Sequence, residues 1–249
     1  MSRLLPVPNE REGGPVLGLR EIRGGQPSVA YSYSEKIRGK VYNRLKLARL
    51  VGSSWVTETV EDGVVASWKA LAFAPDGNPS IAYMVGDTLK FAHKTGSTWA
   101  IQSIETGALF ISLAYDLAGQ PTISHQTPMV GGLTSLRFVR WDGFQWVAEV
   151  VLTGVLLSYS SLAYDTAGIA AISYGVSTIP FCSNQLWIAR RTGCSGTCWV
   201  NQLIEDFAPS GVNFCPSLAF GPTGAAAISF GWNGTTYPDR DLKFATQLP

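Results

Sequence analysis

Residues 71–83 read Leu-Ala-Phe-Ala-Pro-Asp-Gly-Asn-Pro-Ser-Ile-Ala-Tyr, which is an apolar run, an Asp-Gly turn and a second apolar run. An Asp-Gly pair between two such runs is typical of a β-hairpin. The same phrase returns elsewhere, in its most degenerate form near the N-terminus. The copies are residues 19–31, 113–125, 162–174 and 218–230. The chain therefore contains five related units.

Two further markers follow the hairpins. The first is Leu-Lys-Phe-Ala or a variant of it, beginning at Leu45, Leu89, Leu136, Leu186 and Leu242. The second is a Trp that opens another strand-like run, at Trp55, Trp99, Trp146 and Trp199. One unit thus holds four strands, named A to D in chain order, in about 45–55 residues, which is the period of a β-propeller blade.

These markers predict an all-β, single-domain, five-bladed β-propeller of four-stranded antiparallel blades. The predicted blades cover approximately residues 15–62, 63–106, 107–153, 154–206, and 207–249 together with 2–8. The last unit stops after its third strand, and we expect residues 2–8 to supply the missing outer strand and close the ring. Pro6 and Pro8 are compatible with an outermost edge strand. A fragment of a longer repeat array remains the alternative.

The innermost strand, A, carries large and small residues on opposite faces. In the third unit Leu113 and Tyr115 are large, whereas Ser112 and Ala114 are small. We expect large residues of one blade to fill the space left by small residues of its neighbour. The outer strand, D, repeats one polar position that we expect to face solvent. Its members are Glu58, Gln102, Glu149 and Gln202.

Composition excludes two classes of protein. The chain of 249 residues has a net charge of +1 and only 15% charged residues, which argues against a general nucleic-acid-binding protein. Apolar residues make up 46%, but they occur in short runs. None approaches the roughly 18–20 residues that a membrane-spanning helix needs, so we expect no membrane span.

Four cysteines, Cys182, Cys194, Cys198 and Cys215, cluster in one region. In an up-and-down blade the B–C and D–A connections emerge on one face and the C–D connection on the other. This geometry predicts the disulfides Cys182–Cys215 and Cys194–Cys198 and disfavours a four-cysteine zinc site. Disulfides indicate an extracellular, cell-surface or periplasmic protein.

The N-terminal residues leave a second possibility for the compartment. Residues 1–10 lack the apolar core of a signal peptide, so we expect a mature or trimmed form of an exported protein. A cytosolic protein with four free thiols remains possible.

The hairpin between strands C and D carries a recurring Gly-x-x-Trp, as in residues 96–99. It resembles the Asp-box of sialidase-type propellers, Ser-x-Asp-x-Gly-x-Thr-Trp. Gly96, Thr98 and Trp99 match that motif, while Ala92 and Lys94 stand where its Ser and Asp would be. The whole repeat resembles bacterial repeat β-propellers grouped with this superfamily. The resemblance implies the fold; because the Asp-box is structural in such families, it does not imply an activity.

A sialidase-like enzyme would need an arginine cluster, a Tyr–Glu pair and an acid/base, and the family's Phe/Tyr-Arg-Ile-Pro motif is absent. The two histidines are His93 and His125, and His125 stands where other units have Tyr or Phe, so we interpret it as a packing variant. The Asp-Gly turns lack the several oxygens that calcium needs. We therefore predict no catalytic residue, no metal site and no cofactor. A degenerate sialidase-like or other glycan-active hydrolase remains the alternative.

The B–C connections are the best functional indication. That of residues 84–88 is short, whereas residues 32–44, 126–135, 175–185 and 231–241 form long ones on one face, where binding usually resides. Tolerated insertions are the alternative interpretation. The candidate ligand-binding residues are Tyr33, Arg38, Lys40, Tyr42, Arg44, Phe181, Trp232 and Tyr237.

Six basic residues and no acid lie within residues 36–49, which could attract an anionic sugar. A solvated loop is the competing interpretation. The leading functional hypothesis is an exported, non-catalytic module that binds a glycan or protein ligand, as a monomer or as part of a larger chain. A structural domain of a larger exported protein is a further alternative.

Overall fold

The computed structural model describes residues 18–21, 27–154, 157–177, 185–193, 199–207, 215–233 and 240–246. These residues form nineteen β-strands arranged in five separate antiparallel sheets. Strands and turns account for their regular structure, and no helix in this part of the chain could span a membrane. The all-β prediction and the four-stranded antiparallel unit are confirmed.

Each of the first three sheets is a meander in which sequential strands are neighbours. The first sheet contains β1 (Gly18–Glu21), β2 (Pro27–Ile37), β3 (Lys40–Val51) and β4 (Ser54–Asp62). The second contains β5 (Ala66–Phe73), β6 (Pro79–Val85), β7 (Thr88–Thr95) and β8 (Thr98–Thr106). The third contains β9 (Leu109–Tyr115), β10 (Pro121–Gln126), β11 (Thr134–Trp141) and β12 (Trp146–Gly154).

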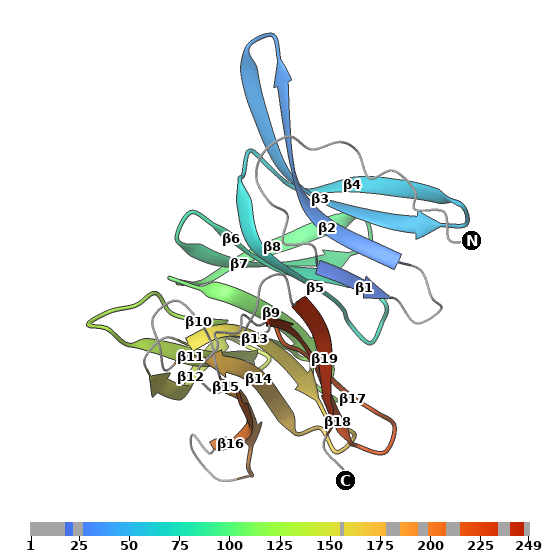
Figure 1. Cartoon of the computed structure of the whole chain (residues 1–249). Helices are drawn as coiled ribbons and strands as arrows, with labels where there is room; N and C mark the ends of the chain where they lie inside the picture. Colours follow the sequence, from blue (N-terminus) through green and yellow to red (C-terminus); the bar gives the residue numbers. More distant parts are fainter. Residues whose placement is uncertain are drawn as a thin grey trace.

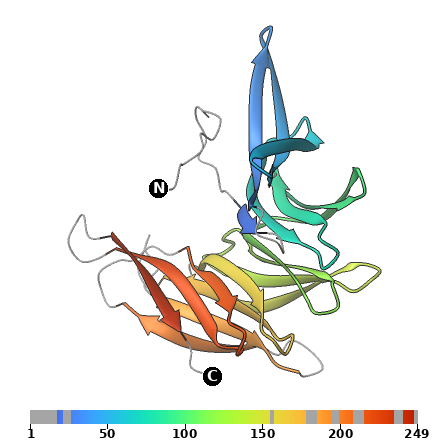
Figure 2. The same ribbon diagram turned by 90° about the vertical axis from the view of Figure 1, so that its right-hand side faces the viewer.

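The last two sheets continue the pattern. The fourth contains β13 (Leu157–Tyr164), β14 (Ala170–Val176), β15 (Gln185–Arg191) and β16 (Trp199–Asp206). The fifth has three strands among the described residues, β17 (Ser217–Phe220), β18 (Ala226–Asn233) and β19 (Arg240–Thr246). Figures 1 and 2 show the sheets following one another along an arc, from the blue first sheet to the red last sheet.

The turns between strands A and B form as the Asp and Gly residues predict. Asp76 accepts a hydrogen bond from the backbone N–H of Asn78 at 2.9 Å, and Gly77 has a φ of 84°. In the fourth sheet Asp165 accepts N–H bonds from Ala167 and Ile169. A side-chain oxygen that satisfies turn N–H groups, followed by a residue free to adopt positive φ, stabilises a tight turn.

The core lies between neighbouring sheets, and it interleaves as predicted. Leu162 of β13 is fully buried, and its backbone N–H donates to the Ser112 hydroxyl of β9 at 3.0 Å. Leu218 of β17 makes the same 3.0 Å contact with Ser161 of β13. The small residue of one sheet thus leaves room for the backbone and Leu of the next, and its hydroxyl accepts the N–H that would otherwise be left unsatisfied.

The polar position of the outer strand does more than face solvent, which corrects the prediction. Glu58 pairs with Lys94 of the next sheet, and Glu149 accepts from Arg191 of the next sheet at 2.7 Å. Exposed Gln102 accepts the indole N–H of Trp146 at 2.9 Å. Hydrogen bonds of this kind tie the outer edges of successive sheets together.

The predicted ring closure is not confirmed. The last sheet ends at β19, and Leu242 and Phe244 on that strand are 68% and 69% exposed. Residues 2–8, the expected fourth strand of this sheet, lie outside the described residues. Among the described residues the five sheets are not closed into a ring and form an open arc.

Candidate functional site

The predicted long loop of residues 32–44 is instead a β-hairpin. β2 and β3 stay paired out to Ile37 and Lys40, and Arg38 (φ 49°) and Gly39 (φ 83°) form the turn. Two successive positive φ angles are the signature of a type I′ turn, which matches the twist of paired strands. In the second sheet the corresponding turn lies at Gly86.

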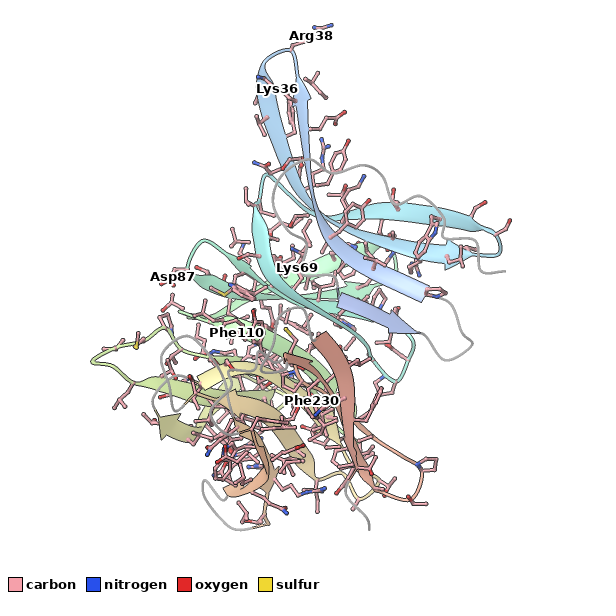
Figure 3. The ribbon with its side chains drawn as sticks, in the orientation of Figure 1. Lys36, Arg38, Lys69, Asp87, Phe110 and Phe230 are labelled. Carbon is pink, nitrogen blue, oxygen red and sulfur yellow. The ribbon has the colours of Figure 1, made fainter. Side chains whose placement is uncertain are left out.

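The first hairpin is longer than the second by about four residues per strand, or about 13 Å at 3.3 Å per residue. It projects alone from the rest of the molecule, with Lys36 and Arg38 near its tip (Figures 1 and 3).

Four of the predicted binding residues share one face of this hairpin. Tyr33 lies opposite Arg44, and Ile37 lies opposite Lys40, so these side chains and Tyr42 point to the same side. Lys40 Nζ lies 5.2 Å and the Arg44 guanidinium carbon 5.8 Å from the centre of the Tyr42 ring. At these distances the cations interact with the ring face. Arg38 occupies the turn itself.

The charges of the hairpin divide into a neutralised part and a tip. Arg44 pairs with Asp62 at 3.0 Å and with Glu35 at 3.5 Å. Lys36, Arg38 and Lys40 are exposed, and no ion pair with a described carboxylate is observed for them. The tip therefore presents three cations to solvent.

The remaining predicted residues are not brought into this group by the described structure. Trp232 lies in β18 opposite Asp241, while Phe181 and Tyr237 lie outside the described residues. Cys215 has a free, exposed thiol, so the predicted Cys182–Cys215 disulfide is not supported. Cys182, Cys194 and Cys198 lie outside the described residues, and the Cys194–Cys198 disulfide stays a prediction.

A row of aromatic rings, missed from the sequence, connects the inner strands of three sheets. We call Trp68 of β5, Phe110 of β9 and Tyr159 of β13 the aromatic row. The Trp68 and Phe110 ring centres are 4.6 Å apart, and those of Phe110 and Tyr159 are 4.4 Å apart. All three rings are half-buried. Edge and tilted contacts at these distances are favourable between aromatic rings.

The row forms because the second, third and fourth sheets each have a β-bulge at the same place in their first strand. Trp68, Phe110 and Tyr159 have φ angles of 44°, 53° and 32°, and the strand A–strand B register shifts beside each of them. A bulge adds one residue to a strand and redirects its side chain. Positive φ at a residue other than Gly costs roughly 1–3 kcal/mol and is concentrated at functional sites.

The aromatic row lies at the B–C end of the sheets. Leu109, next to Phe110, pairs with Gln126 at the end of β10, and Ser158, next to Tyr159, pairs with Gly175 near the end of β14. Long B–C connections were predicted to bind ligands at this same end. Figure 3 shows Lys69 beneath the projecting hairpin and Phe110 farther from the hairpin, in the middle of the molecule.

A sequence signal for the row existed. Each aromatic residue stands three positions before the Leu of its repeat, namely Leu71, Leu113 and Leu162. In the fifth unit Cys215 holds the corresponding place before Leu218. Burial, with a smaller contribution from the nearby Cys215, raises the pKa of Tyr159. The repeated position was missed because its residue differs from unit to unit, being Trp, Phe or Tyr.

Lys69 adds a buried cation beside the row. Its Nζ donates to Ser32 Oγ and to the Ala66 carbonyl, each at 3.1 Å, and the residue is 6% exposed. Buried lysines are held by hydrogen bonds because an isolated charge is costly to remove from water. Ser32 comes from β2, so Lys69 links the first hairpin to the second sheet.

His125 is fully buried, and its ring also contacts a carboxylate. Its Nε2 contacts Glu105 of the preceding sheet, which also accepts from Arg137 at 2.9 Å. Burial would raise the pKa of Glu105, but His125 and Arg137 outweigh it and hold the pKa below its usual value. A carboxylate that stays ionised between two hydrogen-bond donors links the two sheets and is a poor general base.

A carboxylate with two donors from the next sheet also occurs one sheet earlier. Glu61 accepts from the Tyr83 hydroxyl at 2.5 Å and from Lys90 at 2.6 Å. Burial, with Glu61 adding to it, raises the pKa of Tyr83, so the phenol stays a neutral donor. Both acids are thus engaged in holding successive sheets together.

Within the described ranges no three His, Cys, Asp or Glu side chains lie close enough to hold a metal ion. The aromatic row and the projecting hairpin present aromatic faces, hydroxyl groups and exposed cations.

No protein-family model matches the chain, and no curated protein matches it in sequence. Three solved structures illustrate what it resembles in three dimensions. The Hadza microbial sialidase Hz136 has a TM-score of 0.64 at 12% identity, with 94% of this chain and 56% of the sialidase covered. The chain thus spans little more than half of the sialidase's length.

An α-L-arabinanase of Penicillium chrysogenum complexed with arabinobiose has a TM-score of 0.62 at 10% identity, covering 91% of this chain and 79% of the arabinanase. A protein of unknown function from Dyadobacter fermentans has a TM-score of 0.62 at 12% identity, covering 88% and 75% of the two chains. At such identities the likeness concerns the fold alone. The chain shares the all-β, propeller-type sheet arrangement of these solved structures.

Proposed function

We propose that this protein is a glycan-binding module that uses the B–C end of its sheets and does not cleave its ligand. The observation that carries the proposal is the aromatic row, built from strained residues at one repeated position. Sugar rings present apolar C–H faces edged by hydroxyl groups, and half-exposed aromatic rings are suited to such ligands.

The exposed cations of the projecting hairpin favour an acidic glycan as the ligand. Lys36, Arg38 and Lys40 attract anions toward the hairpin, and Tyr33 and Tyr42 on its face offer rings beside the cations. An ulvan lyase with the same kind of fold, TM-score 0.63, was solved bound to -[GlcA(1-4)Rha3S]-, an acidic saccharide. This complex supports a glycan as the ligand here in preference to a protein.

A non-catalytic role is favoured because the carboxylates of Glu61 and Glu105 are already paired with cations, and that of Glu61 also accepts a hydrogen bond from a buried hydroxyl. Hydrolysis of a glycosidic bond needs two carboxyl groups free to act on either side of it. The sialidase and arabinanase with the same fold keep the enzymatic alternative open to test. We further propose that the protein is exported, because a module that binds glycans outside the cell has to be secreted.

A glycan array that includes sulfated, carboxylated and neutral oligosaccharides tests the proposal. The variants Trp68→Leu and Phe110→Leu retain apolar volume but remove aromatic faces, and we expect them to bind several-fold to about tenfold more weakly. Phe144→Leu is the matched control, because Phe144 is 91% exposed on a C–D turn at the other end of the third sheet. Equal affinity in all three variants would contradict a role for the aromatic row.

A second comparison tests the charge of the hairpin. Replacing Lys36, Arg38 and Lys40 by Ser should weaken binding to acidic glycans, should flatten its salt dependence, and should leave neutral glycans unaffected. Unchanged retention on heparin and polysialic acid columns would refute the acidic-ligand assignment. Release of product from any glycan or fluorogenic glycoside would show an enzyme in place of a binding module.

A further inference from the structure

Backbone strain in the described part of the chain falls on four residues other than glycine. Trp68, Phe110 and Tyr159 are the aromatic row, and the fourth is Arg38, with a φ of 49°. All four lie at the B–C end of their sheets, since Arg38 stands in the turn that joins β2 to β3. Strained residues are concentrated at sites that contact ligands. The backbone therefore groups Arg38 with the aromatic row.

The third sheet shows that the strain at Arg38 is not needed to make the turn. Its B–C connection contains the same pair of angles, with φ of 60° at Gly131 and 82° at Gly132. The flanking Val130 and Leu133 exchange two backbone hydrogen bonds, of 2.9 and 3.1 Å. Glycine adopts these angles without a steric penalty, whereas a residue with a Cβ does not. The first sheet places an arginine where a glycine would fit better.

The side chain of Arg38 gives no local reason for this choice. Arg38 is exposed, and it makes no hydrogen bond or ion pair with another described residue. Figure 3 shows it at the apex of the hairpin, pointing away from the rest of the molecule. A guanidinium group can donate two parallel hydrogen bonds to the two oxygens of a carboxylate or sulfate, which a lysine ammonium cannot do. The group is thus placed to hold an oxyanion that comes from outside the protein.

The base of the hairpin adjoins the aromatic row. Ser32 of β2 accepts a hydrogen bond at 3.1 Å from Nζ of Lys69, the residue that follows Trp68. The hairpin then continues from Ser32 to Arg38, which is about 20 Å at 3.3 Å per residue. This distance is much longer than a single sugar ring, so only a ligand of several linked sugars can contact the row and Arg38 together.

We propose that the aromatic row and Arg38 are the two ends of one site for a long acidic glycan. Sugar rings lie against the aromatic row, and Arg38 holds a carboxylate or sulfate farther along the same glycan. This inference rests on the glycan-binding function proposed above, and it adds the length of the ligand and the residue that recognises its charge. Because the row already holds the glycan, the contact with Arg38 forms within the complex, and affinity rises once the ligand is long enough to reach it.

Two series of size-fractionated oligosaccharides test the proposal by titration calorimetry. Oligogalacturonides carry carboxylates and heparin fragments carry sulfates, so the series that loses affinity in the Arg38 variants identifies the oxyanion. The wild-type protein should bind fragments longer than about 20 Å more tightly than disaccharides of the same series. Loss of this increase in neither series would overturn the assignment of Arg38.

Three variants separate the guanidinium group from its charge. Arg38→Asn should weaken binding of the long fragments about tenfold, because a charge-assisted pair of hydrogen bonds is lost. Arg38→Lys keeps the charge and should still weaken binding several-fold. Lys36→Asn removes a charge beside Arg38 and should weaken binding no more than about threefold. Disaccharides should bind to the wild type and to both Arg38 variants equally well.

A measurement without ligand tests the strain at Arg38. Asn followed by Gly is strongly preferred in type I′ turns. Arg38→Asn should therefore slow hydrogen–deuterium exchange of the hairpin amides, in the same variant that binds long fragments more weakly. Unchanged or faster exchange would show that the arginine does not strain the turn, and would overturn the argument that Arg38 is held there for a ligand.

The binding data also distinguish failure of this proposal from failure of the glycan-binding function. Equal affinity of the wild type and Arg38→Asn for long fragments, together with weaker binding by Phe110→Leu, would overturn the two-ended site alone. Affinity that does not rise with fragment length would do the same. A wild-type protein that binds no fragment of either series and no neutral glycan would overturn the glycan-binding function and this inference with it.

Discussion

The contrast between Phe138 and Phe244 gives the most informative stability prediction, because the two residues hold one repeat position in different surroundings. Phe138 is 1% exposed, its ring centre lies 5.2 Å from that of Trp199, and Arg191 lies 5.8 Å from its ring. Replacing a buried Phe by Ala costs about 3–5 kcal/mol, because transfer and cavity terms add. Phe244 is 69% exposed, so the same replacement should cost about 1 kcal/mol or less.

Urea unfolding of Phe138→Ala and Phe244→Ala, followed by tryptophan fluorescence at low protein concentration, measures both values. For a chain of this size 1 kcal/mol corresponds to about 2–4 °C in the melting temperature. Phe138→Ala should therefore melt roughly 6–20 °C lower, and Phe244→Ala no more than about 4 °C lower. Equal losses in the monomer would refute the open arc, because they would mean that the chain's own first sheet covers Phe244.

Three further predictions concern single groups. The pKa of Glu105 is lowered in the folded state, so its ionised form stabilises the fold above the unfolded-state pKa, and this contribution is lost as pH falls through the folded-state pKa. Glu105→Gln should therefore have a smaller free energy of unfolding than the wild type at pH 7, and the two values should become equal in acid. Gly77→Ala should lose about 1–2 kcal/mol through its φ of 84°, whereas Gly193→Ala, with open space and no positive φ, should lose little in the same thermal melts. Asp165→Ala removes the acceptor of two turn N–H groups and should lose about 1–2 kcal/mol in urea, and an unchanged midpoint would contradict the role of its carboxylate in the turn.

The repeated sheet could be predicted from the sequence because its signals are local. An Asp-Gly turn, an apolar run of alternating size and a Trp at the start of the outer strand each act within a few residues. Five copies of the same phrase make the pattern hard to mistake. The interleaving of Leu162 with Ser112 followed from residue size alone.

The first hairpin was misread because strand extension there depends on polar residues. The Tyr-Ser-Tyr-Ser segment at residues 31–34 alternates but has no apolar face to bury, and Arg38-Gly39 is a less obvious turn than Asn-Gly. The residues expected to bind were nevertheless found together, because Tyr33, Lys40, Tyr42 and Arg44 fall on one side of the paired strands.

The aromatic row and the exposure of Phe244 could not be predicted from a single unit. A bulge that sets Phe110 at positive φ is decided by contacts between sheets, and Trp68 and Tyr159 become its neighbours only after the sheets assemble. Phe244 has the same local sequence as Phe91. The two residues differ in exposure because another sheet covers Phe91 and none of the described sheets covers Phe244. The local sequence of a strand does not indicate whether another sheet follows it.

Hydrogen–deuterium exchange of the protein with and without the glycan that it retains most strongly tests the functional account most directly. The account predicts slower exchange at the starts of β5, β9 and β13 and at the β2–β3 hairpin, with the glycan recovered intact. Slower exchange confined to the C–D turns, such as that around Phe144, or recovery of a cleaved glycan, would contradict it.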